Sequence, residues 1–289
     1  MRMQFWRDGI SNALSLKPPK EPVAVLLAAA QAQLLTNTDG KSKFSKTWLQ
    51  RIINEREKYL HSPPYPDIQT LETYAENTYS TLLYLTLQAL PMASVTADHL
   101  ASHIGKAQGI VAVLRGLPLL AFPQPPQHHT PQGQFAGSLG GPQRQGVVTL
   151  PLDIMARHNV REHEVLRKGI EAQGLRDAIF EVATRANDHL ITVREMLKNL
   201  RSGQEAGHEF EHQDDMEHGS QGEAEGGKGV PAQLADVERA FGVLMPAVPA
   251  QDWLDRLQKV DFDVFQPTLR TSGWKLPVKV WWDFRQRQL

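Results

Sequence analysis

Pairs of carboxylates are the first feature of this sequence that could do chemistry. Glu72 and Glu76 lie four residues apart, as do Asp177 and Glu181, so each pair would share one face of a helix. Two carboxylates at this spacing can hold Mg²⁺ together with a phosphate group. Charged residues on a solvated helix face follow the same spacing, and we predict that simpler arrangement for both pairs. The alternating acidic residues of 261–263 fit a metal ligand set and a turn between helices equally well.

The histidines are the second candidate for chemistry, since eleven of them occur and histidine binds zinc. His208, His212 and His218 lie among acidic residues in a low-complexity tract that fixes no ligand geometry, and His128-His129 lie in another. The sequence has no cysteine, which excludes disulfides, thiolate metal sites and cysteine nucleophiles. It also lacks HExxH, P-loop, GxGxxG and GxSxG motifs. We therefore predict no cofactor, no metal and no catalytic residue.

The overall charge gives no sign of a strongly charged partner. The chain of 289 residues carries 31 basic and 32 acidic side chains, a net charge of −1. A balance this close provides no general attraction for nucleic acid or for an anionic membrane, so any such partner would have to be met by a local patch. We predict no nucleic-acid partner. The longest apolar run covers residues 23–35, well short of the roughly 20 residues that span a bilayer.

The elements that must position these residues are helical nearly throughout, because apolar residues recur every three or four positions. Thr96 is a plausible N-cap, and Pro118 should break the helix that precedes it. The segment 22–35 is apolar on most sides and should be buried, whereas Glu55 and Arg56 belong to a solvent-facing surface. We predict helices over residues 3–13, 22–35, 44–59, 68–90, 96–117, 151–158, 161–172, 175–200, 230–244, 252–260 and 276–284.

Two segments interrupt this pattern. Residues 122–145 are rich in Pro, Gln and Gly, and residues 202–229 contain almost no apolar side chain. Such compositions cannot bury enough surface to offset the entropy lost on ordering. We therefore predict a single domain over residues 1–289 with low-complexity insertions at about 122–145 and 202–229.

Small residues form a stripe along the predicted helix 96–117. Glycine lowers helix propensity by up to about 1 kcal/mol per residue, so tertiary structure must compensate. Either a neighbouring helix packs very closely against the stripe, or the stripe lines a cavity for a ligand. The stripe consists of Ala101, Gly105, Gly109, Ala112 and Gly116.

The same helix resembles one in squalene and phytoene synthases, which ends in a pattern like N-I-L-R-D-x-x-E-D and is followed by G-R-x-Y-L-P. Residues 110–116 and 146–153 match this frame, with a longer insertion between the two parts. Residues 71–78 are similar to the Y-C-x-x-V-A-G helix of those enzymes, and residues 1–10 to their R-L-x-W-W-R helix. The resemblance implies an all-α, isoprenoid-synthase-like helical bundle.

The departures from that pattern imply lost catalysis. The family uses aspartate-rich motifs to hold Mg²⁺ on a diphosphate leaving group, where the metal neutralises developing charge. In this chain Gly116, Leu119 and Leu120 replace the three carboxylates of D-x-x-E-D. The resemblance then implies a degenerate pocket, with candidate residues Tyr74, Asn77, Gly105, Gln108, Gly109, Ala112 and Arg115.

A closer resemblance exists to the complex I assembly factor 6 family, which is non-enzymatic. It is carried by residues 54–58, 74–78, 103–111 and 260–265 and covers almost the whole chain. It implies a mitochondrial protein on the matrix side of the inner membrane, associated peripherally with that membrane. It also implies a role in assembling NADH:ubiquinone oxidoreductase, with complex I subunits or other assembly factors as partners.

Two other functions stay open beside this one. The first is an active squalene/phytoene synthase-like prenyltransferase acting on isoprenoid diphosphates, against which the missing carboxylates count. The second is a protein that keeps the cavity and binds a lipid or isoprenoid. Because the resemblance begins partway into the family pattern, we also expect further N-terminal helices and a presequence to be encoded upstream of this chain.

Overall fold

The computed structural model describes residues 2–90, 92–123, 146–206 and 229–289, and within these ranges it is helical and contains no strand. The all-α prediction is confirmed. The α-helices are α1 (Arg2–Leu14), α2 (Pro22–Asn37), α3 (Lys46–Lys58), α4 (Ile68–Ala75), α5 (Thr81–Ala89), α6 (Val95–Ala121), α7 (Leu152–Arg157), α8 (Glu162–Lys168), α9 (Leu175–Arg201), α10 (Val230–Leu244), α11 (Ala247–Lys259) and α12 (Leu276–Gln286). A π-helix, η1 (Glu76–Ser80), joins α4 to α5, and short 3₁₀ turns η2 (Gly169–Glu171) and η5 (Pro267–Arg270) follow α8 and α11.

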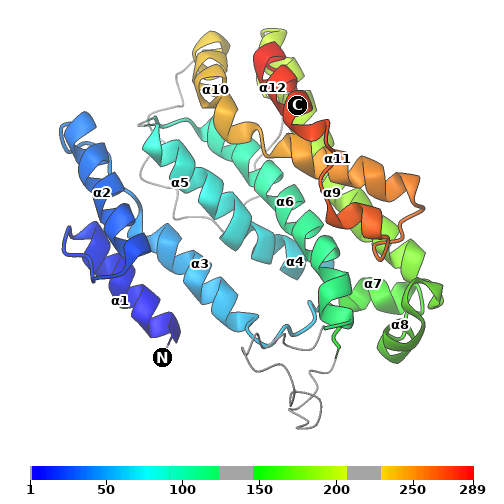
Figure 1. The fold of residues 1–289 in the computed structure, drawn as a ribbon. Helices are drawn as coiled ribbons and strands as arrows, with labels where there is room; N and C mark the ends of the chain where they lie inside the picture. The colour runs from blue at the N-terminus through cyan, green and yellow to red at the C-terminus, as the bar shows by residue number, and fades with distance from the viewer. Residues whose placement is uncertain (1, 91, 124–145, 207–228) are drawn as a thin grey trace.

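Helix α6 is the centre of the fold (Figure 1). It packs against α4, η1 and α5 on one side and against α9, α10 and α11 on the other. Leu100, Ile104, Ile110 and Leu114 on this helix are completely buried. The 27 residues of α6 are long and apolar enough to cross a membrane, but 56% of the most apolar window is buried inside the protein. A helix in the core of a protein can be as long and as apolar as a membrane-spanning helix, and the packing of α6 is that of a core helix.

Both ends of α6 differ from the prediction. Ser94, not Thr96, is the N-cap, and its Oγ accepts a hydrogen bond of 3.3 Å from the backbone N–H of Ala97. Pro118 does not break the helix, which continues to Ala121. A proline inside a helix costs about 3 kcal/mol. Here Pro118 and Ala121 are both buried, so tertiary packing on this last turn offsets the missing hydrogen bond.

The predicted helix 68–90 is interrupted by the π turn η1. The side-chain hydroxyl of Thr81 donates 3.0 Å to the carbonyl oxygen of Glu76, five residues earlier. π turns of this kind are rare and insert one extra residue into an otherwise α-helical segment. Hydrophobic periodicity over 68–90 predicted the helix correctly but contains no signal for this interruption.

Helices α1 and α2 form a small peripheral unit at the edge of the molecule (Figure 1). Ala13 of α1 packs against Ala24 and Ala28 of α2 in a cluster separate from the main core. The prediction that residues 22–35 are buried is wrong, since Val23 is 57% and Leu26 is 69% exposed. The physical reason is that α2 packs mainly on α1, so the other faces of α2 have no helix covering them in the described chain.

Candidate functional site

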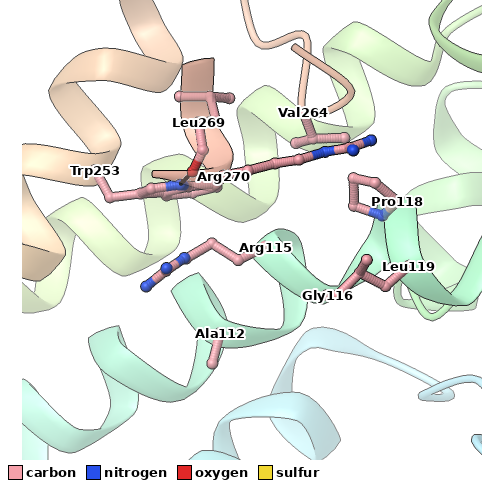
Figure 2. A pocket seen from close by; sticks show the side chains of 9 residues that line it. All are labelled: Ala112, Arg115, Gly116, Pro118, Leu119, Trp253, Val264, Leu269 and Arg270. Atoms are coloured by element: carbon pink, nitrogen blue, oxygen red, sulfur yellow. Dashed lines mark hydrogen bonds between the residues drawn. The ribbon is translucent and has the colours of Figure 1, made fainter. Parts of the chain in front are cut away.

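Two pockets lie on opposite sides of the C-terminal half of α6. The first, which we call the arginine pocket, has a volume of about 380 Å³. Arg115 projects into it from α6, while Trp253 and Arg270 come from α11 and η5 on the opposite wall (Figure 2). Its full lining is Ala112, Arg115, Gly116, Pro118, Leu119, Trp253, Val264, Leu269 and Arg270. Arg115 and Arg270 form no ion pair within the part of the chain that the structure describes, so the pocket combines apolar walls with two unpaired cations.

The second pocket, the tyrosine pocket, has a volume of about 250 Å³. It is lined by Arg56, Tyr59, Ser62, Pro63, Tyr65, Tyr74, Tyr79, Ala112, Val113, Gly116, Leu120 and Thr149. Ala112 and Gly116 line both pockets, because their small side chains leave room on either side of α6.

Tyrosines 59, 65 and 74 pack as a triangle at one end of the tyrosine pocket. Their ring centroids lie 4.8 Å apart for Tyr59–Tyr65, 5.0 Å for Tyr59–Tyr74 and 5.5 Å for Tyr65–Tyr74. Arg56 donates a hydrogen bond of 2.7 Å to the Tyr74 hydroxyl, and its guanidinium lies 5.6 Å from the ring of Tyr79. Aromatic pairs at these distances stabilise the fold beyond the area they bury.

The tyrosine pocket offers neutral hydrogen-bonding groups. Burial raises the pKa of Tyr65, and it raises the pKa of Tyr74 despite the neighbouring Arg56 guanidinium, so both hydroxyls stay protonated at neutral pH. The Thr149 side chain is 5% exposed, and its Oγ1 has no hydrogen-bond partner among the described residues. An unpaired buried hydroxyl costs free energy unless a ligand or water satisfies it.

The lining of neither pocket includes an aspartate or glutamate. Gly116 and Leu119 line the arginine pocket, and Leu120 lines the tyrosine pocket. These are the positions at which the sequence resemblance predicts the carboxylates of D-x-x-E-D. Mg²⁺ takes oxygen ligands, above all carboxylates, so these residues do not fit a divalent cation. More widely, the described ranges contain no group of three or more acidic or histidine side chains placed to hold a metal ion.

The structure brings together only part of the predicted pocket. Tyr74, Ala112 and Arg115 line the two pockets, whereas the half-buried Gln108 lines neither. Asn77 is turned towards α3, where its Nδ2 donates 3.1 Å to Glu55. Glu55 itself is only 4% exposed, so its predicted place on a solvent-facing surface is wrong.

Gly105 and Gly109 also lie outside the pockets, and their assignment to the degenerate pocket needs correcting. A Cβ added to Gly105 would lie 2.3 Å from the Cα of Ser80, and one added to Gly109 would lie 2.3 Å from the Cβ of Ala75. These glycines therefore let α6 approach both ends of η1 closely. Gly116 has no atom within 4 Å of such a Cβ. The small-residue stripe thus serves close packing at Gly105 and Gly109, and borders pockets at Ala112 and Gly116.

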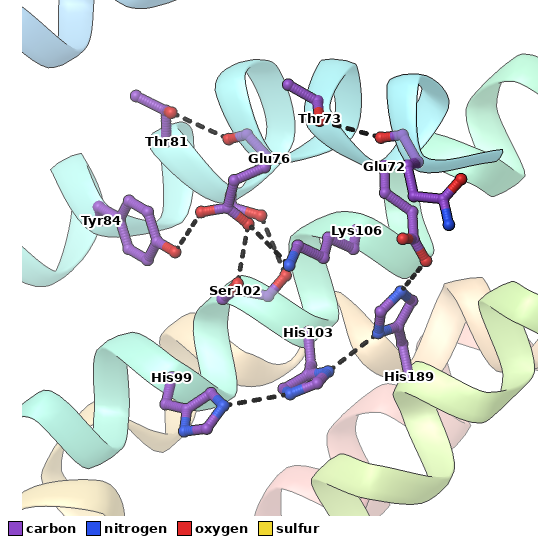
Figure 3. Close-up of polar contacts among 12 residues, drawn as sticks. Glu72, Thr73, Glu76, Thr81, Tyr84, His99, Ser102, His103, Lys106 and His189 are labelled. Carbon is purple, nitrogen blue, oxygen red and sulfur yellow. Dashed lines mark hydrogen bonds and ion pairs between the residues drawn. The ribbon is translucent and has the colours of Figure 1, made fainter. Parts of the chain in front are cut away.

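The carboxylates Glu72 and Glu76 face the protein, not solvent as predicted, since each side chain is only 12% exposed. Glu72 accepts a hydrogen bond from Arg185 of α9. It accepts a second one, of 2.8 Å, from His189 Nε2 of the same helix (Figure 3). Burial raises the pKa of Glu72, but these two donors outweigh burial and bring the pKa to about 2. Its carboxylate is therefore ionised and paired.

Glu76 is held by a different set of donors. The Tyr84 hydroxyl and the Ser102 Oγ, at 2.8 Å, donate to its two oxygens, and Lys106 Nζ lies 4.0 Å away (Figure 3). The two carboxylates therefore bind separate partners and do not form a shared Mg²⁺ site. The other predicted carboxylate pair, Asp177 and Glu181, lies on α9. There Glu181 forms an ion pair with Arg157, which is a structural contact like those of Glu72 and Glu76.

Three buried histidines continue from Glu72 in a chain that sequence analysis missed (Figure 3). His189 Nδ1 lies 2.9 Å from His103 Nδ1, and His103 Nε2 lies 3.2 Å from His99 Nε2. Because the ionised Glu72 can only accept, His189 donates from Nε2. When all three rings are neutral, His103 Nδ1 donates to His189 and His99 Nε2 donates to His103. The one signal in the sequence was the four-residue spacing of His99 and His103.

The other candidate metal ligands either belong to a turn or lie outside the described residues. The acidic segment 261–263 is a turn, in which Asp263 Oδ1 accepts 3.0 Å from the backbone N–H of Phe265 and Asp261 pairs with Arg176. The histidines at 128–129 and 208–218 lie outside the described residues.

Comparison with known proteins identifies the family to which this helical fold belongs. The sequence profile of the squalene/phytoene synthase family matches residues 1–275. The chain belongs to the squalene/phytoene synthase family. Gly116, Leu119 and Leu120, at which the sequence resemblance predicts that the carboxylates are replaced, border the two pockets beside α6.

Individual relatives within the family share a single name. The chain is 35% identical over 281 residues to a Rattus norvegicus protein named complex I assembly factor 6, covering 97% of this chain and 64% of the relative. The Homo sapiens protein of that name is 34% identical over 96% of this chain and 63% of its own length. A Dictyostelium discoideum homologue is 25% identical over 92% of this chain and 56% of its own length. The chain thus spans a little under two thirds of the length of the mammalian relatives.

Proposed function

We propose that this protein is an assembly factor for mitochondrial respiratory complex I. The observation that carries the proposal is the match to relatives named complex I assembly factor 6, which extends over 97% of the chain. Identity of 35% over 281 residues supports a role shared with these relatives. Its partners are then complex I subunits or other assembly factors, and it acts in mitochondria, on the matrix side of the inner membrane and in peripheral association with it.

We also propose that the protein does not catalyse prenyl transfer. The family chemistry needs carboxylates that hold Mg²⁺ on a diphosphate. In this chain Gly116, Leu119 and Leu120 stand where one set of those carboxylates belongs, and the pockets beside them are lined by arginines without acidic residues. An arginine pocket attracts an anion, but it supplies no ligand for the metal that would activate a leaving group.

Loss of the protein tests the assembly role. Deleting its gene in the cells of origin should lower the amount of complex I seen by native electrophoresis, while the other respiratory complexes stay at their normal level. Expressing the full-length gene product again should restore complex I. Normal complex I in the deleted cells would rule out the role.

A separate assay tests catalytic silence. The purified full-length protein is incubated with farnesyl or geranylgeranyl diphosphate and Mg²⁺, and diphosphate release is measured. We expect no release above the protein-free reaction. Turnover in the usual enzyme range of about 1 per second would show that the missing carboxylates are not needed.

Binding of a lipid or isoprenoid is a second candidate function, favoured by one observation. Thr149 places an unpaired, buried hydroxyl on the wall of the tyrosine pocket, where a bound molecule would satisfy it. The pocket volume of about 250 Å³ lies below the range typical of small-molecule sites, so a ligand would be enclosed only in part. Native mass spectrometry of the purified full-length protein tests this, because an occupied pocket retains a co-purified lipid and a packed one does not.

A further inference from the structure

Helix α12 carries a dense group of exposed tryptophans. Trp281 and Trp282 are 55% and 53% exposed, and Trp274, just before the helix, is 82% exposed. Val278 adds a further 62% exposed apolar side chain. Single exposed apolar residues are common on protein surfaces, but several large ones on one element mark an interaction site.

The opposite face of the helix packs against the protein, although none of its residues is fully buried. Leu276 and Val280 pack against the main core, and the ring of Phe284 lies 6.4 Å from that of the completely buried Phe241. An α-helix turns by 100° per residue, so Val278, Trp281, Trp282 and Arg285 share the outer face. The tryptophans are therefore presented by a docked, ordered helix at the periphery of the molecule (Figure 1).

Positive charge accompanies the tryptophans. Lys275, Lys279 and Arg285 form no ion pair in the described part of the chain, while the one acidic residue of the helix, Asp283, is on the half-buried side. Lys275 Nζ lies 5.3 Å from the Trp274 ring, and the Arg285 guanidinium lies 5.6 Å from the Trp281 ring. The chain as a whole has a net charge of −1, so this basic surface is a local feature.

Tryptophan beside lysine and arginine fits one occupant better than others. Tryptophan rings favour the boundary between lipid headgroups and acyl chains, and exposed basic residues attract anionic headgroups. Protein interfaces are enriched in tryptophan and arginine but depleted in lysine, and two of the three cations here are lysines. A second copy of this chain would also bring like charges together. We propose that the outer face of α12, with Trp274, Val278, Trp281 and Trp282 and their three neighbouring cations, binds the surface of an anionic lipid bilayer. This inference rests on the peripheral membrane association proposed above and names the surface that makes it.

A second exposed apolar face provides a matched control. Val23 and Leu26 on α2 are as exposed as the α12 residues, but helix α2 (Pro22–Asn37) contains no charged residue and no tryptophan. If exposed apolar area alone caused lipid binding, both faces would contribute. If the combination of tryptophan and cation is required, only α12 will.

The test uses the full chain and vesicles of phosphatidylcholine with or without the anionic lipid phosphatidylglycerol. We expect the protein to co-sediment with the anionic vesicles only, less so at high salt, with a blue shift of its tryptophan emission. W281Q/W282Q and K275Q/K279Q/R285Q should each weaken binding about tenfold or more, since each cation near such a surface strengthens binding several-fold. V23S/L26S should bind as the unmodified chain does.

Three results would overturn the proposal. These are unchanged binding in both α12 variants, equal binding to neutral vesicles, or a concentration-dependent dimer that the α12 variants abolish. Circular dichroism of each variant verifies that it is folded before its binding is measured. The assembly role is tested separately through complex I abundance, so α12 can fail as the membrane surface while that role stands, and the reverse.

Discussion

Helix α6 lies very close to α4 and η1 at two of its glycines. We predict that adding a single methyl group at either glycine lowers the stability of the protein, although the same change usually raises it. Alanine is the better helix former, so replacing a glycine in a helix normally stabilises it by up to about 1 kcal/mol. At Gly109 the new Cβ would lie 2.3 Å from the Cβ and 2.7 Å from the Cα of Ala75, whereas ordinary contacts are 3.4–4 Å. The two helices must separate by about 1 Å, which loosens buried contacts along α6.

The expected cost of Gly109→Ala follows from these distances. Overpacking of a well-packed core costs about 1–3 kcal/mol, which exceeds the propensity gain. We therefore expect Gly109→Ala to destabilise the protein by about 1–2 kcal/mol net. Gly105→Ala should cost more, because its Cβ meets the backbone Cα and N of Ser80 and no side-chain movement relieves that contact.

Urea unfolding followed by circular dichroism measures these changes, and Gly116→Ala is the matched control on the same helix. No atom lies within 4 Å of a Cβ at Gly116, so that substitution should stabilise the protein by about 0.5–1 kcal/mol. Adding Ala75→Gly should recover part of the loss at Gly109, since it removes the nearer of the two contacts. Equal effects of alanine at positions 109 and 116 would refute the reasoning.

Three further predictions concern buried polar groups. The pKa of Glu72 lies near 2 in the folded state and near 4.5 in the unfolded state. Its contacts with Arg185 and His189 therefore contribute about 3 kcal/mol of stability above pH 4.5, which is lost as the pH falls towards 2. Glu72→Gln should flatten the pH dependence of the unfolding free energy between about pH 2 and 5, as measured by urea titrations. His103→Leu should cost about 1–3 kcal/mol in urea unfolding at pH 7, because it removes the buried hydrogen-bond partner of His189 Nδ1. Thr149→Val should be neutral or stabilising by up to about 1 kcal/mol in thermal unfolding, unless a bound ligand uses the hydroxyl.

Local periodicity predicted the helices, because each depends on residues three or four positions apart. It failed where distant residues decide the outcome. Glu72 seemed solvated, yet its partner Arg185 lies 113 residues further along the chain. Pro118 should have ended a helix whose last turn is held by packing against other elements.

The residues of the candidate pocket were likewise predicted only in part. Tyr74 and Arg115 follow from the family resemblance and do line pockets. Gly109 does not, because only the folded arrangement reveals whether a small residue faces a cavity or another helix. The histidine chain was missed for the same reason: two of its members are four residues apart, but the third comes from α9.

The π turn between α4 and α5 has a consequence for changes in chain length. An extra residue in a regular α-helix would rotate everything after it by 100° and expose residues that were buried. A π turn absorbs the extra residue within one turn, so α4 keeps its packing on α6 and the hydrogen bonds of Glu72 to α9, while α5 keeps its packing on α6. One residue could therefore be removed from or returned to residues 76–80 while α4 and α5 each keep the same side chains facing α6.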